Sequence, residues 1–387
     1  MIIHFHHSLS PNSGDVKRIC NIDKEISAVY KDNTIEVVFC PSRKLKKVRG
    51  EWFFKLSSNT IRKFCIPLIP RAGIVNDYYE AFILLVIALY YRPTAIVGEM
   101  YFPKSMVGLV KYFLPKVEII ADIHGAAVDE ELYVNPNLSK DRLKMLIERD
   151  KYTTTKADYV LCQSDEMKRY INEKYKVSNE KICVYRCGYD SSLFKIDEDS
   201  RVRIRRQLRQ ENNVLFVYSG GLHKWQRVED SLRIFKNYHE QNSASAFLIL
   251  TGNQTSLNTI LSKQEFCSIK DSIISTSVPF KDVPSYLNAC DVAFLQRDNH
   301  VMNAVASPTK LAEYMACGLP VISSEVSKYW ITPEARAFII VDDNIVNNDS
   351  IDTVLASSNK LKISQYAYNN LSLELDNDNL VTFFGSK

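Results

Sequence analysis

The feature that most constrains this chain is an alternation of short β-branched runs with longer segments whose apolar residues recur at helical spacing. In the first half, the runs predict strands at 2–6, 35–39, 95–98, 117–121, 159–162 and 182–185. The segments between them predict helices at 15–30, 78–90, 104–113, 141–153 and 165–175. Such alternation predicts a parallel sheet that is covered by helices on both faces.

The alternation stops once and then restarts. Residues 188–213 are polar and charged, contain few strand formers, and include a basic helical pattern at 201–209. Beyond them, strands are expected at 214–219, 247–251, 273–275, 292–295, 321–323 and 338–341, and helices at 228–239, 283–289 and 308–317. A chain of 387 residues is long enough for two such units of ordinary size.

These patterns predict an α/β protein with two Rossmann-like, doubly wound parallel-sheet domains that face a cleft. The expected boundaries are an N-terminal domain at 1–190, a linker at 191–212, a second domain at 213–360 and a C-terminal helical segment at 361–387. Open parallel sheets bind their ligands beyond the carboxyl ends of the strands. The loops that follow the strands are therefore the expected place for chemically active residues.

The bulk composition excludes some classes of protein. The net charge is +4 and basic residues are interleaved with acids, so a nucleic-acid binder is not expected. The chain does not begin with a basic run and an apolar stretch, and its longest apolar run, 81–91, is too short to span a bilayer. We expect a cytoplasmic protein without a metal site, because the nine cysteines show no zinc-site spacing.

The stretch 43–55 mixes basic residues with aromatics. This pattern suits peripheral contact with an anionic membrane, which would place the protein at the inner face of the cytoplasmic membrane. An exposed basic loop explains the pattern equally well, so both interpretations stay open.

The segment 306–322 is the most informative one. Ser307 suits the N-cap of a helix, Pro308 suits its first position, and Gly318 suits its C-terminal cap. A helix N-terminus beside a parallel sheet presents backbone N–H groups and a positive dipole to a diphosphate, and Lys310 adds a charge there. Glu313, one turn further, can accept hydrogen bonds from a ribose. An ordinary capped helix is the alternative, and local physics does not choose between the two.

The same segment resembles the donor-binding motif of retaining glycosyltransferases of family four, which have the GT-B fold. It is most similar to a subgroup with the pattern Ser-Pro-Thr-Lys-Leu-x-Glu-Tyr, here Ser307 to Tyr314. Arg297 and Asn303 fit the spacing of that subgroup upstream of the motif, and 218–226 resembles the first strand and glycine turn of its donor domain. One departure is Val305, which stands where many members of the family carry the first glutamate of a Glu-x7-Glu motif.

In the N-terminal half the resemblance is thinner. Residues 10–15 resemble the glycine-containing loop after the first strand, with Gly14 close to the ligand. Asp122, His124 and the following acids resemble an Asp-x-His-Gly…Glu motif that faces the cleft. The resemblance also implies a C-terminal helix that crosses back to the first domain.

The resemblance implies roles for individual residues. His124 would touch the donor sugar or orient the acceptor hydroxyl, and Glu313 would bind the ribose. Arg297 and Lys310 would stabilise the departing diphosphate, with Lys224 and Arg227 as further candidates. Asp122 would support His124, and either Glu130 or Glu131 would position the acceptor. The remaining donor-binding candidates are Gly14, Gly220, Gly221, Asn303, Ser307, Pro308, Thr309 and Leu311.

The implied activity is a retaining, metal-independent transfer that needs no cofactor. The expected donor is a nucleotide diphosphate sugar, most plausibly a UDP-linked hexose or N-acetylhexosamine. The expected acceptor is a glycan or lipid-linked glycan in bacterial surface polysaccharide synthesis, such as capsule or O-antigen. Two alternatives remain: a sugar-nucleotide epimerase of the same fold, and a non-catalytic partner that binds nucleotide sugar or glycan.

Overall fold

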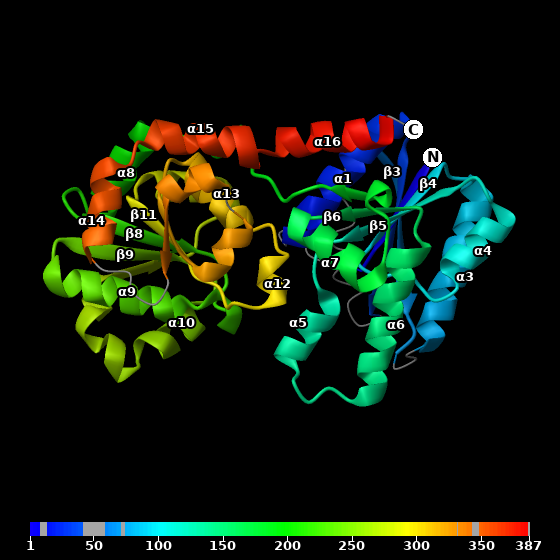
Figure 1. The fold of residues 1–387 in the computed structure, drawn as a ribbon, viewed down its shortest axis with the longest axis horizontal. Coiled ribbons are helices and arrows are strands. Elements are labelled where there is room, and N and C mark those ends of the chain that lie inside the picture. Colours follow the sequence, from blue (N-terminus) through cyan, green and yellow to red (C-terminus); the bar gives the residue numbers. More distant parts are fainter. Residues whose placement is uncertain (8–13, 42–58, 71–73, 331, 343–347, 386–387) are drawn as a thin grey trace. The chain divides into compact units, whose positions relative to one another are not determined.

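A computed structural model of the chain describes residues 1–7, 14–41, 59–70, 74–330, 332–342 and 348–385 (Figure 1). Internal contacts divide the chain into two compact units, Met1–Arg186 with Asp376–Lys387, and Cys187–Leu375. The chain thus leaves the first unit after Arg186 and returns to it within its last helix, α16 (Leu373–Gly385). Each unit is described by itself below.

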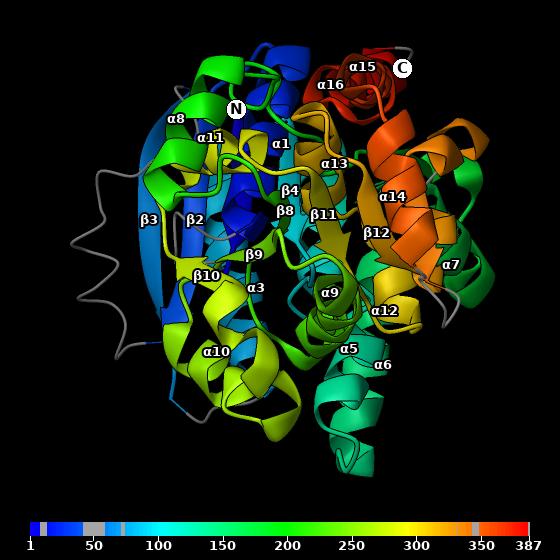
Figure 2. The same ribbon diagram turned by 90° about the vertical axis from the view of Figure 1, so that its left-hand side faces the viewer.

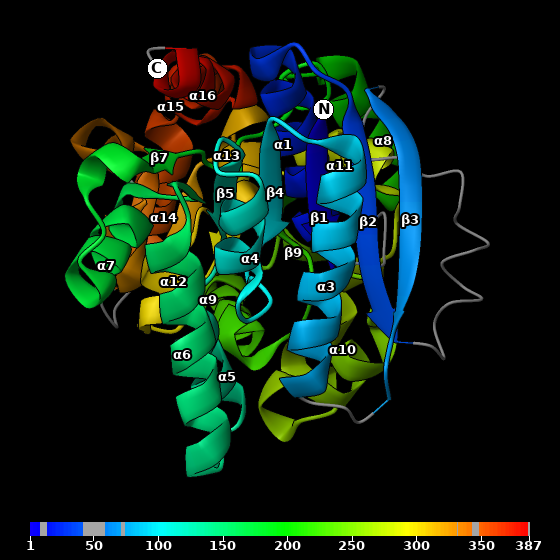
Figure 3. The same ribbon diagram turned by 90° about the vertical axis from the view of Figure 1, so that its right-hand side faces the viewer.

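The first unit is built on a parallel sheet in the order β3-β2-β1-β4-β5-β6-β7. Its strands are β1 (Ile2–His6), β2 (Thr34–Pro41), β3 (Thr60–Leu68), β4 (Ala95–Glu99), β5 (Glu118–Ile123), β6 (Tyr159–Cys162) and β7 (Ile182–Val184). Its helices are α1 (Gly14–Tyr30), α3 (Ile74–Tyr91), α4 (Met106–Phe113), α5 (Ala127–Val134), α6 (Lys140–Lys156), α7 (Asp165–Tyr175) and the later part of α16. Figure 3 shows α3, α4 and α6 in front of this sheet.

The last residues of α16 pack on the first unit. The ring of Phe384 lies 6.0 Å from that of Tyr30 and 5.4 Å from that of Tyr159. The predicted segment 361–387 is therefore divided, because α15 (Lys360–Leu371) belongs to the second unit.

The second unit is built on a parallel sheet in the order β10-β9-β8-β11-β12-β13 (Figure 2). Its strands are β8 (Val214–Ser219), β9 (Ser245–Leu250), β10 (Ile273–Thr276), β11 (Val292–Leu295), β12 (Val321–Ser324) and β13 (Ile339–Asp342). Its helices are α8 (Glu198–Leu208), α9 (Val228–Gln241), α10 (Gln254–Leu261), α11 (Val283–Asn288), α12 (Val301–Ala304), α13 (Thr309–Ala316), α14 (Asn348–Ser357) and α15.

Alternation along the central strands gives this unit a core on each face of its sheet. Val217 of β8 packs in one cluster with α13, whereas its neighbour Phe216 packs in the other cluster with Phe235 of α9. Successive residues of a strand point to opposite faces, so a strand buried on both sides is largely apolar at successive positions. The two parallel sheets confirm the predicted fold class.

Two local predictions were incomplete. Strand β3 was not predicted, because it is an edge strand that carries Arg62 and Lys63 and is only partly buried. The predicted linker 191–212 contains the predicted basic helix, which is α8. Arg201 and Arg205 of α8 both form ion pairs with Asp291 beside β11. This helix therefore packs within the second unit.

Candidate functional site

Lys310 lies in the first turn of α13, and its ammonium reaches the carboxyl end of β8. Its Nζ donates to the Tyr218 hydroxyl at 3.1 Å and to Oε1 of Gln226 at 3.0 Å. The ammonium also lies 4.7 Å from the centre of the Tyr218 ring, which is a cation–π distance. The motif lysine is thus held beside the loop where a parallel sheet binds its ligands.

Gly220 makes room for this lysine. Its φ of 137° belongs to a region that residues with a side chain rarely adopt. A Cβ atom at Gly220 would lie only 2.4 Å from Nζ of Lys310. The glycine is therefore required both by its backbone conformation and by the close approach of the ammonium.

The surroundings of Lys310 disfavour the protonated, charged form of its side chain. Burial, and then the positive charge of Arg297, lower the pKa of Lys310 to about 7, although Glu313 opposes this shift. The hydrogen-bond partners of its Nζ, Tyr218 and Gln226, are both uncharged. An anion placed here would raise the pKa of Lys310 again, so the site favours anionic ligands.

Arg297 follows β11 and is the second cation of the cluster. Its backbone N–H donates to Oγ of Ser324 at 2.9 Å, and its Nη1 donates to Oδ1 of Asn303 at 3.2 Å. Its buried Nε has no hydrogen-bond partner among the described residues. Burial lowers the pKa of Arg297, yet a guanidinium stays charged in proteins. It therefore retains unused capacity to donate to a ligand.

Asn303 and Tyr314 fix the surroundings of the two cations. Asn303 is buried, and its Nδ2 donates to the carbonyl of Asp298 at 2.9 Å. The buried Tyr314 hydroxyl accepts from the backbone N–H of Ser219 at 2.8 Å, which ties α13 to the end of β8. Neither Tyr218, Gln226 nor Tyr314 was predicted as part of the site.

The start of α13 differs from the prediction in one respect. The N-cap residue is Pro308, not Ser307, and no side chain caps the helix. Oγ of Ser307 instead accepts from the backbone N–H of Cys187 at 3.2 Å, because the loop after β7 passes beside it. Thr309 is exposed at the first helical position, and Leu311 is buried in the core. Amides of a first helical turn without a side-chain cap can donate to an anion.

Glu313 lies one turn beyond Lys310 and is half-buried. Its charge raises the pKa of Lys310, so the two side chains attract each other across one helical turn.

A cavity of about 610 Å³ opens beside Gly220, at the carboxyl ends of β8, β9 and β10. Both Gly220 and Gly221 line it, together with Thr251, Asn253 and Val278 and their neighbours. Among the described residues its lining does not include Arg297, Lys310 or Glu313, but Lys310 lies against Gly220 at its edge. A volume of this size is typical of a site for a small molecule.

Lys224 and Arg227 lie at a second, smaller cavity of about 240 Å³. Lys224 is exposed. Arg227 has a φ of 45°, donates from Nε to Asp230 at 2.5 Å and lies 3.8 Å from Asp298. Two acids thus already hold Arg227, which makes it a weaker candidate for the diphosphate than Arg297.

The first unit carries a separate buried network around Asp122 and His124. The Arg18 guanidinium donates to Oδ1 of Asp122 at 2.6 Å and to Oδ2 at 2.8 Å. His124 Nδ1 lies 3.2 Å from Oδ2 of the same carboxylate. Burial alone would raise the pKa of Asp122, but Arg18 and His124 outweigh it and hold that pKa well below its usual range. Asp122 is thus an anion that orients the His124 ring.

His4 and Glu99 extend this network and were not predicted. His4 Nε2 lies 2.7 Å from Oε1 of Glu99, and its Nδ1 lies 3.3 Å from Asp23. Burial would lower the pKa of His4, but its two carboxylate partners raise it to about 10. Burial and the charge of Asp122 raise the pKa of Glu99 to about 7. Charged residues within apolar strands were the available signal, since a buried charge requires a partner.

Glu99, Asp122 and His124 bring ligand atoms within 4.8 Å of one another, a spacing that suits a metal ion. However, the Arg18 guanidinium donates to both oxygens of Asp122. It would repel a cation from the same carboxylate. We therefore interpret this cluster as an ion-pair network that sets the position and charge of His124.

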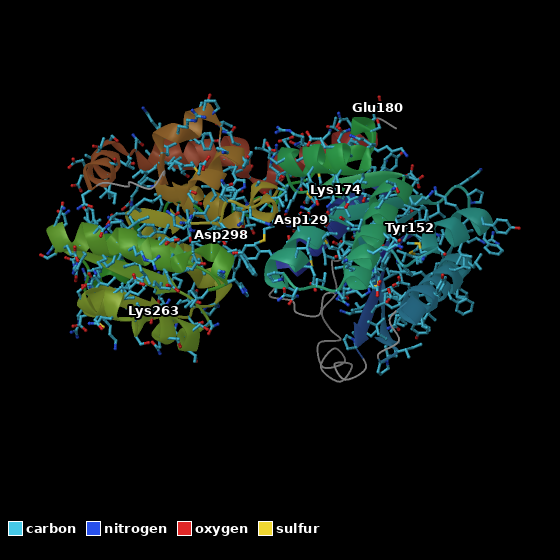
Figure 4. All side chains as sticks on the ribbon, turned by 60° about the horizontal axis from the view of Figure 1, so that its bottom comes forward. Asp129, Tyr152, Lys174, Glu180, Lys263 and Asp298 are labelled. Atoms are coloured by element: carbon cyan, nitrogen blue, oxygen red, sulfur yellow. The ribbon has the colours of Figure 1, made fainter. Side chains whose placement is uncertain are left out.

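The structure places the two candidate acceptor acids differently. A Cβ atom at Gly125 would lie 2.6 Å from Oε1 of Glu130, so this carboxylate packs on the backbone next to His124. Oε1 of Glu131 instead accepts from the side chain of Asn135 at 3.1 Å. Asp129, at the start of α5, pairs with Lys174 of α7 at 3.3 Å (Figure 4).

Two predicted elements lie wholly or partly outside the described residues. Of the predicted loop 10–15, Gly14 and Asp15 lie at the start of α1, whereas residues 10–13 lie outside the described residues. The basic-aromatic stretch 43–55 lies outside them as well.

Comparison with known proteins identifies the kind of molecule to which these two units belong. Residues 200–368 match the family model of glycosyl transferases group 1, and residues 30–193 match the model of Glycosyltransferase Family 4. Each half of the chain thus matches a glycosyltransferase family, and the two units have the GT-B fold. The narrower Ser-Pro-Thr-Lys subgroup stays a prediction.

Two sequence relatives are distant from this chain. TuaH of Bacillus subtilis, a candidate glycosyltransferase of teichuronic acid biosynthesis, is 23% identical over 189 residues, which are 49% of this chain and 46% of TuaH. The chain thus matches about half the length of that relative. An uncharacterized glycosyltransferase of Methanocaldococcus jannaschii is 22% identical over 284 residues, which are 70% of this chain and 68% of the relative.

Among solved structures, HepE of Anabaena in complex with UDP and glucose is similar, with a TM-score of 0.69 and 13% identity over 100% of this chain and 99% of HepE. At this identity the likeness establishes the fold.

Proposed function

We propose that this glycosyltransferase moves a hexose or N-acetylhexosamine from a UDP-sugar to a glycan or lipid-linked glycan, with retention at the anomeric carbon and without a metal ion. The proposed setting is the synthesis of a bacterial surface polysaccharide, at the inner face of the cytoplasmic membrane. A similar fold that binds UDP and glucose in HepE, and the teichuronic acid pathway in the name of TuaH, support the donor and acceptor classes.

The observation that carries the donor site is the pair of cations at the end of β8. Lys310 lies against Gly220 with a pKa of about 7, and Arg297 lies close enough to contribute to that low value. A diphosphate would relieve their mutual repulsion, and its own charge would be stabilised as it leaves the sugar. In this proposal the two side chains take the part that a divalent cation has in other transferases.

The second unit also offers partners for the base and the ribose of the nucleotide. The cavity of about 610 Å³ is open enough for a base and ribose, and it begins at the two glycines beside Lys310. Glu313, one turn from Lys310, is proposed to accept hydrogen bonds from the ribose hydroxyls. Val305 is buried, so it leaves the role of the first glutamate of the Glu-x7-Glu motif unfilled at that position.

In the first unit we propose His124 as the residue that contacts the sugar or the acceptor hydroxyl. Burial would lower its pKa, but the hydrogen bond to Asp122 and the charges of Asp122 and Glu99 raise it. A cationic His124 would donate a hydrogen bond to a sugar oxygen from the nitrogen that Asp122 does not hold. Glu130, which packs beside His124, is the better candidate of the two acids for positioning the acceptor.

Thermal unfolding with nucleotide ligands tests the donor site. UDP, GDP, ADP and CMP compounds are added in the presence of a chelator, and the melting temperature is recorded. We expect stabilisation by UDP and UDP-sugars that is lost in Glu313→Ala and in Lys310→Gln. Stabilisation that persists in both variants would refute the site, whereas stabilisation by another nucleotide alone would refute the base assignment.

Retention is tested on the product. The anomeric configuration of the new bond is read from the proton coupling constants of a transfer product made with the stabilising nucleotide sugar. A product with inverted configuration would exclude a retaining transferase. Interconversion of the sugar nucleotide without an acceptor would support the epimerase instead.

A further inference from the structure

The longest apolar run of the sequence, 81–91, lies in helix α3 and is only half covered. One side of α3 packs on the first sheet through residues such as Ala81, Leu84 and Ala88, which are fully buried. The other side exposes Phe82 at 60% and Tyr90 at 78%. A helix that is apolar on all sides requires cover on all sides.

The exposed residues form one continuous stripe. Along α3 they are spaced by three or four residues, the spacing of one helical face, and they comprise Val75, Tyr78, Phe82, Val86, Leu89 and Tyr90. Helix α4 lies beside α3 and adds Leu109, Tyr112 and Phe113, with Tyr112 exposed at 81% (Figure 3). We call these nine residues the apolar face. Contiguous exposed apolar surface of this kind marks an interaction site.

The exposed charges of the segments that carry the apolar face have one sign, although Asp158, outside these segments, pairs with Lys111 of α4 at 2.6 Å. In residues 59–70 and 74–117 the acids are Asp77, Glu80 and Glu99, and all three are buried. The basic residues of the same ranges that are exposed are Arg62, Arg92, Lys104 and Lys116. Arg62 reaches the end of α3, where its Nη1 donates to the Tyr91 hydroxyl at 2.5 Å.

We propose that the apolar face is a docking surface for an anionic lipid bilayer. Tyrosine and phenylalanine rings enter the boundary between headgroups and acyl chains, where a tyrosine hydroxyl stays hydrated. The four exposed basic residues beside the face, which we call the cationic rim, contact anionic headgroups; they are Arg62, Arg92, Lys104 and Lys116. A second copy of this chain fits less well, because a two-fold interface would bring the cationic rims of both copies together.

This surface differs from a membrane span and from the stretch 43–55. None of the helices in the described ranges combines the length and hydropathy that a bilayer crossing requires. The α3–α4 surface would instead lie on the bilayer, as interfacial helices do. The inference does not depend on the identity of the nucleotide donor.

Vesicle sedimentation of the full chain tests the proposal. Vesicles of phosphatidylglycerol mixed with phosphatidylcholine are compared with vesicles of phosphatidylcholine alone. We expect binding to the anionic vesicles that weakens at high salt. Phe82→Ser with Val86→Ser should weaken it at least about tenfold, since both side chains would return to water. Arg92→Gln with Lys104→Gln should weaken it by about an order of magnitude.

Matched controls come from another exposed part of the same unit. Val134→Ser with Ile147→Ser removes exposed apolar residues of α5 and α6, and Lys140→Gln with Lys144→Gln removes exposed charges of α6. These controls should bind vesicles as the unchanged protein does, and circular dichroism verifies the fold of every variant.

Several results would overturn the proposal. One is the absence of binding to anionic vesicles, and another is equal weakening in test and control variants. A third is binding that survives Phe82→Ser with Val86→Ser but disappears when Lys44, Lys46 and Lys47 are neutralised. A dimer in solution that dissociates in the Phe82→Ser, Val86→Ser protein would show that a second copy covers the face.

Discussion

Binding of a nucleotide sugar should be coupled to proton uptake by Lys310. With a pKa of about 7, this ammonium is half deprotonated near neutral pH in the ligand-free protein. A diphosphate beside it favours the protonated form and raises the pKa. The folded, ligand-free protein must therefore take up a proton from solution when the donor binds at alkaline pH.

The magnitude follows from the free protein. At about pH 8 only about one tenth of Lys310 is protonated, so binding should take up about 0.9 proton per ligand. At about pH 6 the uptake by this group falls to about 0.1 proton. Between about pH 7 and the pKa of the complex, affinity should fall about tenfold per pH unit.

Isothermal titration calorimetry in two buffers with different ionisation enthalpies measures this uptake directly. A UDP-sugar is the suitable ligand, because both of its phosphates are esterified and neither titrates in this range. Lys310→Arg keeps the charge at all pH values, so its binding should show no uptake and little pH dependence. Lys270→Arg, at an exposed position of the same unit outside the candidate site, is the matched control and should behave as the unchanged protein.

Equal binding enthalpies in the two buffers at about pH 8, with binding intact, would refute the reasoning. The same holds for proton uptake that persists in Lys310→Arg. Either result would mean that the ammonium is not the group that meets the diphosphate, or that its charge is already stable without ligand.

Other consequences of the structure can be measured in the same protein. Gly220→Ala should lose donor binding at least about tenfold in calorimetry, because its Cβ would displace the Lys310 ammonium and strain the backbone. Arg18→Met should lower the free energy of unfolding in urea by about 3–5 kcal/mol, since Asp122 would become an unpaired buried anion. Arg18→Met with Asp122→Asn should recover much of that loss. His4 has a raised pKa, so its contribution to stability is complete below about pH 6.5 and is lost as pH rises through about 10. The difference in urea midpoint between unchanged protein and His4→Gln should therefore shrink over that range.

The sequence predicted most of the fold because the strands of both sheets are buried on two sides. Predicted strands 214–219 and 292–295 coincide with β8 and β11, whose residues are almost all buried and apolar. Strand β3 was missed for the opposite reason, since it is only partly buried: Arg62 is exposed, and Lys63 pairs with the buried Glu36 at 2.9 Å. Pattern-based prediction detects burial, and it fails where a strand is only partly buried.

The donor site was predictable in its residues but not in its contacts. Lys310, Arg297 and Asn303 were singled out by a local motif and its spacing. Tyr218 and Gln226, the partners of Lys310, lie 92 and 84 residues away from it in the chain, and only the strand order brings them together. The capping role of Ser307 was wrong because Cys187, 120 residues away, offers its hydroxyl a backbone N–H.

In the first unit, the sequence pattern indicates that some buried charged residues have partners, but it does not identify those partners. His4, Glu36 and Glu99 interrupt strands that are largely apolar, and each must have a partner because a buried charge alone is very costly. Which partner it meets depends on the neighbours of β1, which pairs with β2 on one side and β4 on the other. The apolar run 81–91 is the opposite case, because apolar residues are exposed there. Its composition indicates burial on all sides, yet the sheet covers only one side of α3, so the other side points to a partner outside the fold.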